Sequence, residues 1–259
     1  MKLPIFAFTP SRFTPSRNLF LACCITLACA DLAQAAPAKE SVELEQALTK
    51  LLQERPELVR EALNTLEQRE STNRALREKQ LIVQLSNAIN AETGSTVLGN
   101  PNGDVTLVEF IDYHCGYCKQ LSANVEALIA KDPQLRVLVK HLPILGEESA
   151  QAAQLMLGVS PGAKAQQVHK ALMGASKLDS ATLHAIETQF QLSRSPQAVT
   201  NKGLAEVQVL ADQLGIQGTP AIVLGEALFR GAPDLSSLEA LIQAQRQQLK
   251  TKSKPLASF

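Results

Sequence analysis

Two short apolar runs flank a helical segment in the middle of the chain. Residues 105–111 (VTLVEFI) and 135–142 (LRVLVKHL) are mainly apolar and rich in β-branched side chains, which is typical of buried strands. Between them, apolar residues recur at helical spacing from Lys119 to Lys131. A shorter run at residues 96–98 predicts an edge strand ahead of this unit. The pattern predicts a strand, a helix and a second strand of an α/β fold.

Helical patterns fill most of the chain beyond this unit, and a hairpin and a last helix follow them. Residues 221–224 and 227–230 predict two strands that are joined by a turn at Gly225-Glu226. Asp234 is placed to cap a final helix, and we expect a frayed tail over residues 251–259. The helical block spans about residues 147–214, with helices expected at 149–157, 163–173, 180–191 and 195–214.

The segment 36–92 contains no glycine and is helical in pattern. Ser41 can cap a first helix and Pro56 suits the first turn of a second, each with an apolar stripe. Residues 67–74 (EQRESTNR) are wholly polar and separate the first stripes from the domain at residues 93–250. Two short amphipathic helices cannot close a core alone. We favour self-association through this segment; a hairpin folded back on its own subunit and an arm that docks a partner are the alternatives.

The first 35 residues have the features of a secretory signal peptide. Basic residues precede an apolar run at 19–32, and Ala33-Gln34-Ala35 fits a cleavage site. The run is short for a membrane span, although a retained anchor and a lipid-modified cysteine are alternatives. Three cysteines lie inside the run: Cys23, Cys24 and Cys29. Cleavage after Ala35 would remove them and leave only Cys115 and Cys118 in the mature protein.

Composition and charge fit one good core and a smaller module. The chain has 259 residues, 45% of them hydrophobic, and 25 basic residues balance 25 acidic ones. This balance gives no indication that the chain binds nucleic acid or an anionic membrane surface. Export places the two remaining cysteines where disulfides form and persist.

The motif Cys115-Gly116-Tyr117-Cys118 lies where the first buried strand hands over to the helix. Unpaired N–H groups and the helix dipole stabilise an anion there, so we expect Cys115 to be partly thiolate near neutral pH. A thiolate attacks disulfides, and Cys118, one turn on, can resolve the mixed disulfide. A zinc site needs about four ligands and lacks a second Cys-x-x-Cys here. A structural disulfide across so short a loop would stabilise little. A redox dithiol is therefore the favoured interpretation.

The order of these elements resembles a thioredoxin fold with a helical insertion, the layout of DsbA-type periplasmic thiol–disulfide oxidoreductases. The resemblance covers roughly residues 97–247. It is specific at three places: Glu109-Phe110 followed by Cys115-Gly116-Tyr117-Cys118-Lys119, residues 140–146 (KHLPILG) and residues 214–221 (LGIQGTPA). It implies an α/β thioredoxin domain behind a helical stalk, and a periplasmic location.

The resemblance implies a client groove beside the redox pair. Thr219-Pro220 would form a cis peptide that faces the two sulfurs, so that a substrate strand could pair beside Cys115. An ordinary trans Thr-Pro turn is the alternative. Gly218 and Tyr117 would complete the substrate-binding surface.

The resemblance also implies a buried acid near the sulfurs. Glu109 lies six residues before Cys115, as the family's buried acid does. Burial would raise the pKa of Glu109 and let this carboxylate relay the proton of Cys118; an exposed glutamate on the strand face is the alternative. Lys140 is a candidate partner for Glu109, and His114 is either a charge beside the thiolate or a solvated loop histidine.

Cys-Gly-Tyr-Cys and the threonine before the proline resemble DsbC-type isomerases, and the whole chain is similar to the ScsC-like branch of the DsbA family. The resemblance implies a dimeric or trimeric disulfide isomerase that acts on unfolded or misoxidised exported proteins. A DsbD-type membrane reductase would keep it reduced. No cofactor is expected besides the redox-active disulfide Cys115–Cys118. The alternatives are a DsbA-type dithiol oxidase and a copper-tolerance protein that binds Cu(I) through the same sulfurs.

Overall fold

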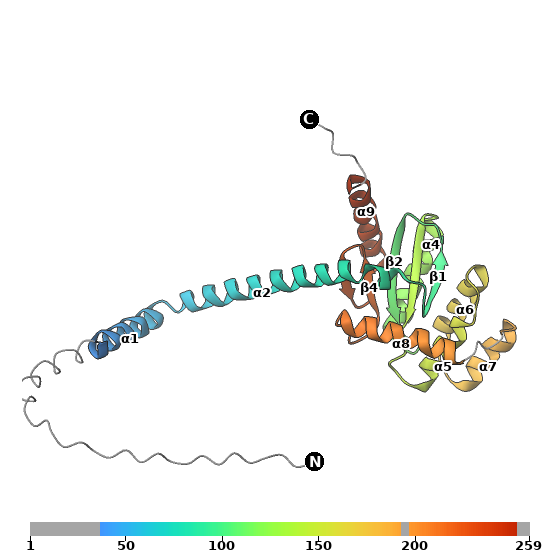
Figure 1. Cartoon of the computed structure of the whole chain (residues 1–259), viewed down its shortest axis with the longest axis horizontal. Coiled ribbons are helices and arrows are strands. Elements are labelled where there is room, and N and C mark those ends of the chain that lie inside the picture. The colour runs from blue at the N-terminus through green and yellow to red at the C-terminus, as the bar shows by residue number, and fades with distance from the viewer. Residues whose placement is uncertain (1–36, 193–196, 253–259) are drawn as a thin grey trace, which may run out of the picture. The chain divides into compact units, whose positions relative to one another are not determined.

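The structure, a computed structural model, describes residues 37–192 and 197–252 (Figure 1). The predicted signal peptide, its three cysteines and the predicted helix start at Ser195 lie outside these ranges. The chain divides into two compact units, the first ending at Glu67 and the second beginning at Gln68. Within the described ranges, no helix is long and apolar enough to cross a membrane.

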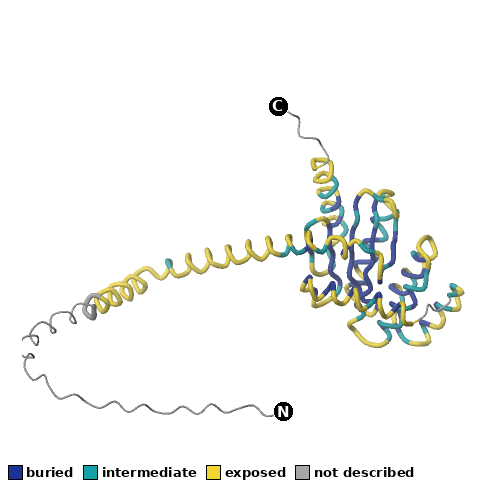
Figure 2. The backbone as a smooth tube through the Cα atoms, viewed as in Figure 1, coloured by how far each residue is buried: buried dark blue, intermediate teal, exposed yellow. Residues whose placement is uncertain are grey.

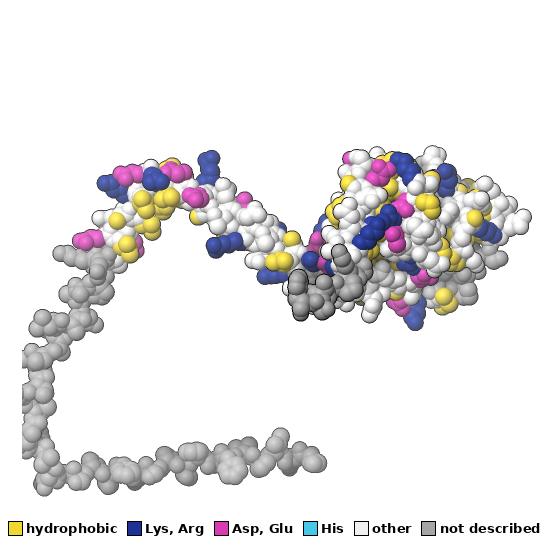
Figure 3. All heavy atoms as spheres, turned by 90° about the horizontal axis from the view of Figure 1, so that it is seen from above, with side chains coloured by type: hydrophobic (Ala, Val, Ile, Leu, Met, Phe, Trp, Pro, Cys, Tyr) yellow, Lys and Arg dark blue, Asp and Glu magenta, His cyan; other side chains and the backbone are white. Residues whose placement is uncertain are grey.

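The first unit contains α1 (Pro37–Glu54) and the first turns of α2 (Glu57–Gln84). Pro56 lies directly before α2, but Ser41 lies inside α1, so the predicted cap at Ser41 is wrong. Both predicted apolar stripes are present and exposed: Figure 2 colours most of the residues of this unit as exposed, and Figure 3 shows apolar side chains gathered on it. Eight of these side chains are 40% to 69% exposed: Val42, Leu44, Leu48, Leu51, Leu52, Val59, Leu63 and Leu66.

Helix α2 continues without a break through the polar stretch at residues 67–74. These residues are all exposed, as the sequence predicted, yet they do not interrupt the helix. Five of the eight residues are Glu, Gln or Arg, which are good helix formers even without an apolar face and so favour the continuity.

The last turns of α2 belong to the second unit. Ile82 on α2 and Ile89 on α3 (Ser86–Asn90) are each 2% exposed and pack with the apolar residues on one face of the sheet. Lys79 also forms an ion pair with Glu226, at 2.8 Å. The compact domain therefore begins earlier in the chain than the predicted boundary at residue 92, because this segment buries its own apolar side chains.

The second unit is built on a five-stranded mixed sheet with the order β1-β3-β2-β4-β5. Strands β2 and β3 are parallel, whereas all other neighbours are antiparallel. All five strands were predicted from the sequence. Their bounds are β1 (Ser95–Gly99), β2 (Val105–Ile111), β3 (Leu135–His141), β4 (Ala221–Leu224) and β5 (Ala227–Arg230).

Helices cover both faces of the sheet, so β2 and β3 are buried on both sides. Leu107 and Ile111 face the core cluster that includes side chains of α4 (Gly116–Lys131), α6 (Ala163–Gly174) and α9 (Leu235–Lys252). Val108 and Phe110 face the second cluster, with α8 and the end of α2. This alternation places Glu109 on the α4 side. The helical insertion comprises α5 (Glu147–Leu157), α6 (Ala163–Gly174), α7 (Ser180–Gln189) and α8 (Gln197–Gln213).

The C-terminal helix α9 (Leu235–Lys252) begins where the sequence predicted. The carboxylate of Asp234 accepts a hydrogen bond from the backbone N–H of Ser237, at 2.7 Å, and so caps the helix. Thr251 and Lys252 are helical, so the predicted tail begins too early. The structure confirms the predicted α/β fold with its helical insertion and preceding helices.

Candidate active site

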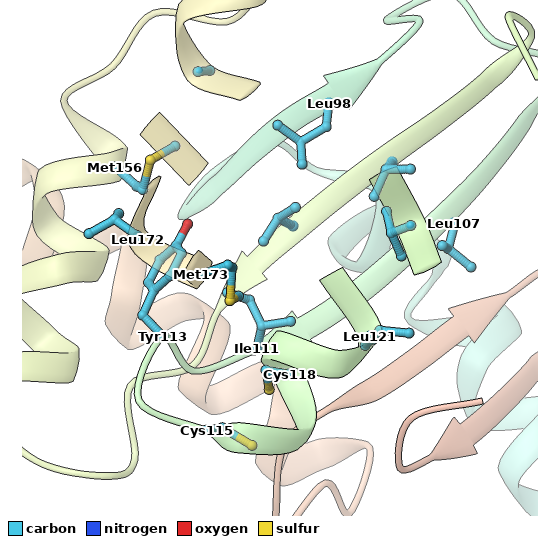
Figure 4. Close-up of a cluster of buried hydrophobic side chains, with 14 of the residues drawn as sticks. Leu98, Leu107, Ile111, Tyr113, Cys115, Cys118, Leu121, Met156, Leu172 and Met173 are labelled. Atoms are coloured by element: carbon cyan, nitrogen blue, oxygen red, sulfur yellow. The ribbon is translucent and has the colours of Figure 1, made fainter. Parts of the chain in front are cut away.

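Cys115 is the residue from which helix α4 starts. Strand β2 ends at Ile111, and Cys115 occupies the N-cap position, with φ −76° and ψ 119°. Its side chain is only 7% exposed. Figure 4 shows the sulfurs of Cys115 and Cys118 at the first turn of this helix. The predicted position of Cys115, at the positive end of a helix dipole, is confirmed.

Cys118 lies one turn further on and is fully buried. Both cysteines that the structure describes are free thiols. Burial, together with the neighbouring Cys115, raises the pKa of the Cys118 thiol well above its ordinary value. Cys118 therefore needs a nearby base before it can attack a disulfide.

The loop before β4 faces the redox pair. The Thr219-Pro220 peptide bond is cis, as the resemblance implied. The Cys115 thiol donates a hydrogen bond to the carbonyl oxygen of Thr219, and the Sγ–O distance is 3.2 Å. Pro220 is buried, whereas Gly218 is exposed at the rim. Tyr117, between the two cysteines, is 66% exposed and open to a client.

Glu109 is a buried acid on the α4 side of the sheet. It is 1% exposed, and its Oε1 atom has no hydrogen-bond partner among the described residues. Burial raises the pKa of this carboxyl to about 8. Burial raises the pKa of Tyr113, and the charge of the Glu109 carboxylate raises it further. Glu109 can exchange a proton in the neutral range.

Lys140 does not lie where the sequence analysis placed it. It is paired in register with Phe110, so its side chain starts from the face opposite Glu109. Its Nζ atom donates a hydrogen bond to the carbonyl oxygen of Ala91, at 2.6 Å. Burial lowers the pKa of this ammonium group to about 8. The proposed pairing of Lys140 with Glu109 is wrong.

The side chain of His114, which the sequence singled out, is exposed, whereas the nearby Asp112 is buried and hydrogen-bonded. Asp112 is 1% exposed, and its carboxylate accepts four hydrogen bonds, three of them from residues 32 to 37 positions away. In the sequence Asp112 is only part of a polar break after the strand, because these long-range donors leave no local signal.

A buried polar network beneath the redox pair was also missed. The hydroxyl of Tyr113 and Nδ1 of His169 are 3.0 Å apart, and the Tyr113 ring stacks on His141 with centroids 5.7 Å apart. Nε2 of His141 lies 2.8 Å from the hydroxyl of Thr96. Burial lowers the pKa of His169 to about 4 and that of His141 to about 3, so both rings are neutral at pH 7. Figure 4 shows Tyr113 extending from the redox loop into the core.

No group of three or more His, Cys, Asp or Glu side chains in the described part of the chain could hold a metal ion. The reactive groups of the site are two thiols and a buried carboxyl, and the Thr219-Pro220 loop approaches the first thiol.

Several known proteins resemble the chain. The family model described as thioredoxin matches residues 90–244. Proteus mirabilis ScsC in a transitional conformation is 28% identical, with a TM-score of 0.62, over 82% of this chain and 99% of that one. A periplasmic thioredoxin-like protein from Salmonella enterica serovar Typhimurium is 27% identical, with a TM-score of 0.60, over 63% and 97%. The thiol-disulfide exchange protein alpha-DsbA2 from Wolbachia pipientis is 25% identical, with a TM-score of 0.58, over 66% and 97%. No curated protein matches the sequence.

Proposed function

Since the chain belongs to the thioredoxin family of thiol–disulfide oxidoreductases, we propose that it is an exported disulfide isomerase that works as a homo-oligomer. The observation that carries the proposal is the arrangement of Cys115 at the start of α4, with its sulfur 3.2 Å from the Thr219 carbonyl oxygen and Cys118 buried behind it. A client sulfur can reach the first thiol but not the second.

The chemistry follows from this difference in access. The Cys115 thiolate attacks a client disulfide, so that a new S–S bond forms to Cys115 and the second client sulfur leaves as a thiolate. A different client thiolate can then attack the mixed disulfide, which rearranges the client and regenerates Cys115. When none does so, Cys118 gives its proton to Glu109 and attacks Cys115, which releases a reduced client and forms the Cys115–Cys118 disulfide.

Two features favour an isomerase over an oxidase. The Gly-Tyr dipeptide between the cysteines contains no histidine, so a thiolate-stabilising group is absent and the disulfide is less oxidising. Threonine precedes the cis-proline, as in the isomerases that the motif resembles. The direction is tested with a protein whose disulfides are scrambled. An isomerase restores the native pairing at catalytic concentration, whereas a dithiol oxidase leaves the wrong pairs in place.

The compartment and partners follow from the same proposal. A neighbour of 27% identity is described as periplasmic, and the first 35 residues have the pattern of a signal peptide. We place the protein in the periplasm, with unfolded or misoxidised exported proteins as clients. An isomerase must stay reduced in an oxidising compartment, so a DsbD-type membrane reductase is the proposed electron donor.

The exposed stripes of α1 and α2 support self-association as a dimer or a trimer. Side chains such as Leu48 and Leu63 lie 52% and 54% exposed along these helices, and a second copy of the same helices offers a matching apolar surface. Several linked active sites would then hold one client by several weak contacts.

Cu(I) binding is the second candidate. Cys115 and Cys118 are adjacent free thiols, and soft thiolate ligands select Cu(I). Titration of the reduced protein with Cu(I) in competition with a simple dithiol tests this function. One ion held more tightly than by the dithiol supports it, and equal or weaker binding removes it.

A further inference from the structure

One imidazole from the helical insertion contacts both segments that flank the redox motif. Nδ1 of His169, on α6, lies 3.0 Å from the hydroxyl oxygen of Tyr113, which is two residues before Cys115. Nε2 of the same ring lies 3.3 Å from the hydroxyl oxygen of Ser122, which is four residues after Cys118 on α4. The segments before and after the two cysteines are therefore joined through a single side chain.

All three side chains of this bridge are buried. Tyr113, His169 and Ser122 are 1%, 2% and 4% exposed. A neutral imidazole has one donor nitrogen and one acceptor nitrogen, and each hydroxyl can donate or accept, so both hydrogen bonds form with either tautomer. Loss of either hydroxyl would leave a buried ring nitrogen without its partner, and an unsatisfied buried polar group is costly. The two bonds therefore favour one fixed arrangement of the three side chains.

Helix α6 gives the imidazole a rigid support. One core cluster contains Val168 and Leu172 of α6 together with Leu121 of α4. Side chains in such a cluster keep fixed positions, because protein interiors are packed as densely as organic crystals. The ring of His169 is therefore held by the core and not by the loop that carries Cys115.

We infer that His169 is a positioning residue of the redox reaction: with Tyr113 and Ser122 it fixes the loop that carries the first cysteine against the helix that carries the second. Cys115 must stay at the start of α4, where unpaired N–H groups and the helix dipole stabilise a thiolate. The disulfide carries no charge at this place and gains less from it. The bridge therefore favours the reduced pair, and the inference rests on the proposed redox function of Cys115 and Cys118.

The reduction equilibrium of the full-length protein tests this role. Two glutathione thiols reduce the disulfide between Cys115 and Cys118, which gives two protein thiols and one molecule of oxidised glutathione. The equilibrium constant is measured for wild type, Tyr113→Phe, Ser122→Ala and the double variant. Each substitution removes one hydroxyl oxygen and no carbon atom, so the packing around the bridge is kept. Urea unfolding of each reduced protein gives the accompanying change in stability.

Thr96→Val is the matched control. The hydroxyl oxygen of Thr96 lies 2.8 Å from Nε2 of the second buried histidine, His141, and Thr96 is 4% exposed. Valine has nearly the same shape without the hydroxyl, so this variant also leaves a buried ring nitrogen without its partner. Thr96 lies on β1, and its hydrogen bond does not join the two segments that flank the motif. The control therefore separates a loss of stability from a loss of positioning.

Tyr113→Phe and Ser122→Ala are each expected to favour the disulfide about three- to tenfold, which lowers the reduction potential by about 15–30 mV. The double variant should match the larger of the two single effects, because either substitution already breaks the bridge. Thr96→Val should keep the wild-type equilibrium, although its stability falls as well.

Three results would overturn the inference. The first is a wild-type equilibrium in both single variants. The second is a double variant in which the two shifts multiply, since the two hydrogen bonds would then act separately. The third is an equal shift in Thr96→Val, which would reduce the effect to stability alone. If Tyr113→Phe does not fold, Ser122→Ala against Thr96→Val still decides the role of His169. A wild-type disulfide that does not exchange with glutathione contradicts the proposed function itself, and the inference with it.

Discussion

At the scale of single residues, the two cysteines differ in their contact with solvent and in how readily they can lose a proton. Cys115 sits at the positive end of α4 and keeps some contact with solvent, whereas Cys118 is fully buried and its pKa is raised by burial. A thiol in that position cannot give its proton to water directly. Glu109 is the buried carboxyl with an Oε1 atom that no described residue contacts, and its pKa of about 8 suits proton exchange near neutral pH. On these grounds we propose that Glu109 accepts the Cys118 proton.

Glu109→Gln is expected to slow the resolution step, in which Cys118 attacks the mixed disulfide at Cys115, by about 10²-fold. In wild type this rate rises with pH through about 8, because only the ionised Glu109 can accept a proton. The variant loses that inflection. Quenched single-turnover measurements between pH 6 and 9, with the trapped mixed disulfide as substrate, give the profile.

Lys140 supplies the control, because burial lowers its pKa to about 8 as well, on the opposite face of the sheet. Lys140→Gln should keep the inflection. If Lys140→Gln loses it and Glu109→Gln keeps it, the assignment of the proton acceptor is wrong.

Glu109 also leaves a signature in stability. Its pKa is about 8 in the folded protein and about 4.5 when unfolded, so the folded state binds more protons between these values. The free energy of unfolding of wild type, relative to Glu109→Gln, should fall as pH rises from about 4.5 to about 8, by on the order of a few kcal/mol. Urea unfolding across this range measures the difference. A difference that stays constant with pH contradicts the buried, protonated state.

The buried histidines have the opposite sign. The pKa of His169 is about 4 in the folded protein against an ordinary 6.5, so the unfolded state binds more protons in that interval. Stability relative to His169→Gln should therefore fall as pH drops from about 6.5 to about 4. The interval from about 5 to 6.5 is diagnostic, because ordinary carboxyls titrate mainly below about 4.5. Urea unfolding of both proteins at pH 5.0 and 6.5 checks this. If the free energy of unfolding changes by the same amount between these two pH values in both proteins, a buried neutral His169 is excluded.

The sequence predicted the residues whose chemistry is carried by a local motif. Cys115, Cys118 and the Thr219-Pro220 dipeptide could be found because the strand, the helix and the motif are adjacent in the chain. Asp112 and Tyr113 were passed over, although both are buried, because their partners lie 32 to 56 residues away. Polar residues that end a strand inside an apolar segment were the available signal. Lys140 was misplaced because proximity in a motif says nothing about which face of a strand a side chain takes.

At the scale of elements, hydrophobic periodicity predicted the strands and helices that have an apolar face, but it could not report on a helical stretch that has none. The five strands were found because each is a short apolar run that ends at a turn, such as Gly225 with φ of 60°. The insertion helices were found from apolar residues at helical spacing. Residues 67–74 have no apolar face, so periodicity could not report whether the helix continues there, whereas α2 runs through them from Glu57 to Gln84.

The end of α2 gives a prediction at this scale. Ile82 is 2% exposed and packs on the sheet, whereas its neighbour Val83 is 51% exposed. Ile82→Ala should lower the free energy of unfolding of the domain by about 2–5 kcal/mol, because it leaves a cavity in a packed core. Val83→Ala, the matched control, should change it by no more than about 0.5 kcal/mol. Denaturant titration of both variants measures the two effects. Equal effects would mean that the end of α2 is not part of the domain core.

At the scale of the whole molecule, the two units differ in how they bury apolar surface. The unit from Gln68 onward has two clusters of buried side chains on the two faces of its sheet. The described helices of the first unit leave their apolar stripes in solvent. A chain that keeps such a stripe needs a surface to cover it, and a second copy is the surface that the proposed function requires. The proposed function thus places the redox chemistry and the self-association in different units.

The assembly can be tested with one charge in the stripe. Leu48 on α1 is 52% exposed, and a buried leucine contributes about 1.5–3 kcal/mol to a contact. Leu48→Glu should therefore weaken self-association at least about tenfold for each copy of the side chain in the interface. Val199→Glu, at a 66% exposed position on α8, is the matched control and should keep the mass of wild type. Sedimentation over a concentration series gives the mass of each protein.

The reaction with oxidised glutathione should survive in Leu48→Glu, because Cys115 and its loop lie in the other unit. The rescue of scrambled clients should fall with the loss of linked sites. A wild type that sediments as a monomer, or a Leu48→Glu variant that keeps its oligomeric mass, would exclude self-association through this stripe.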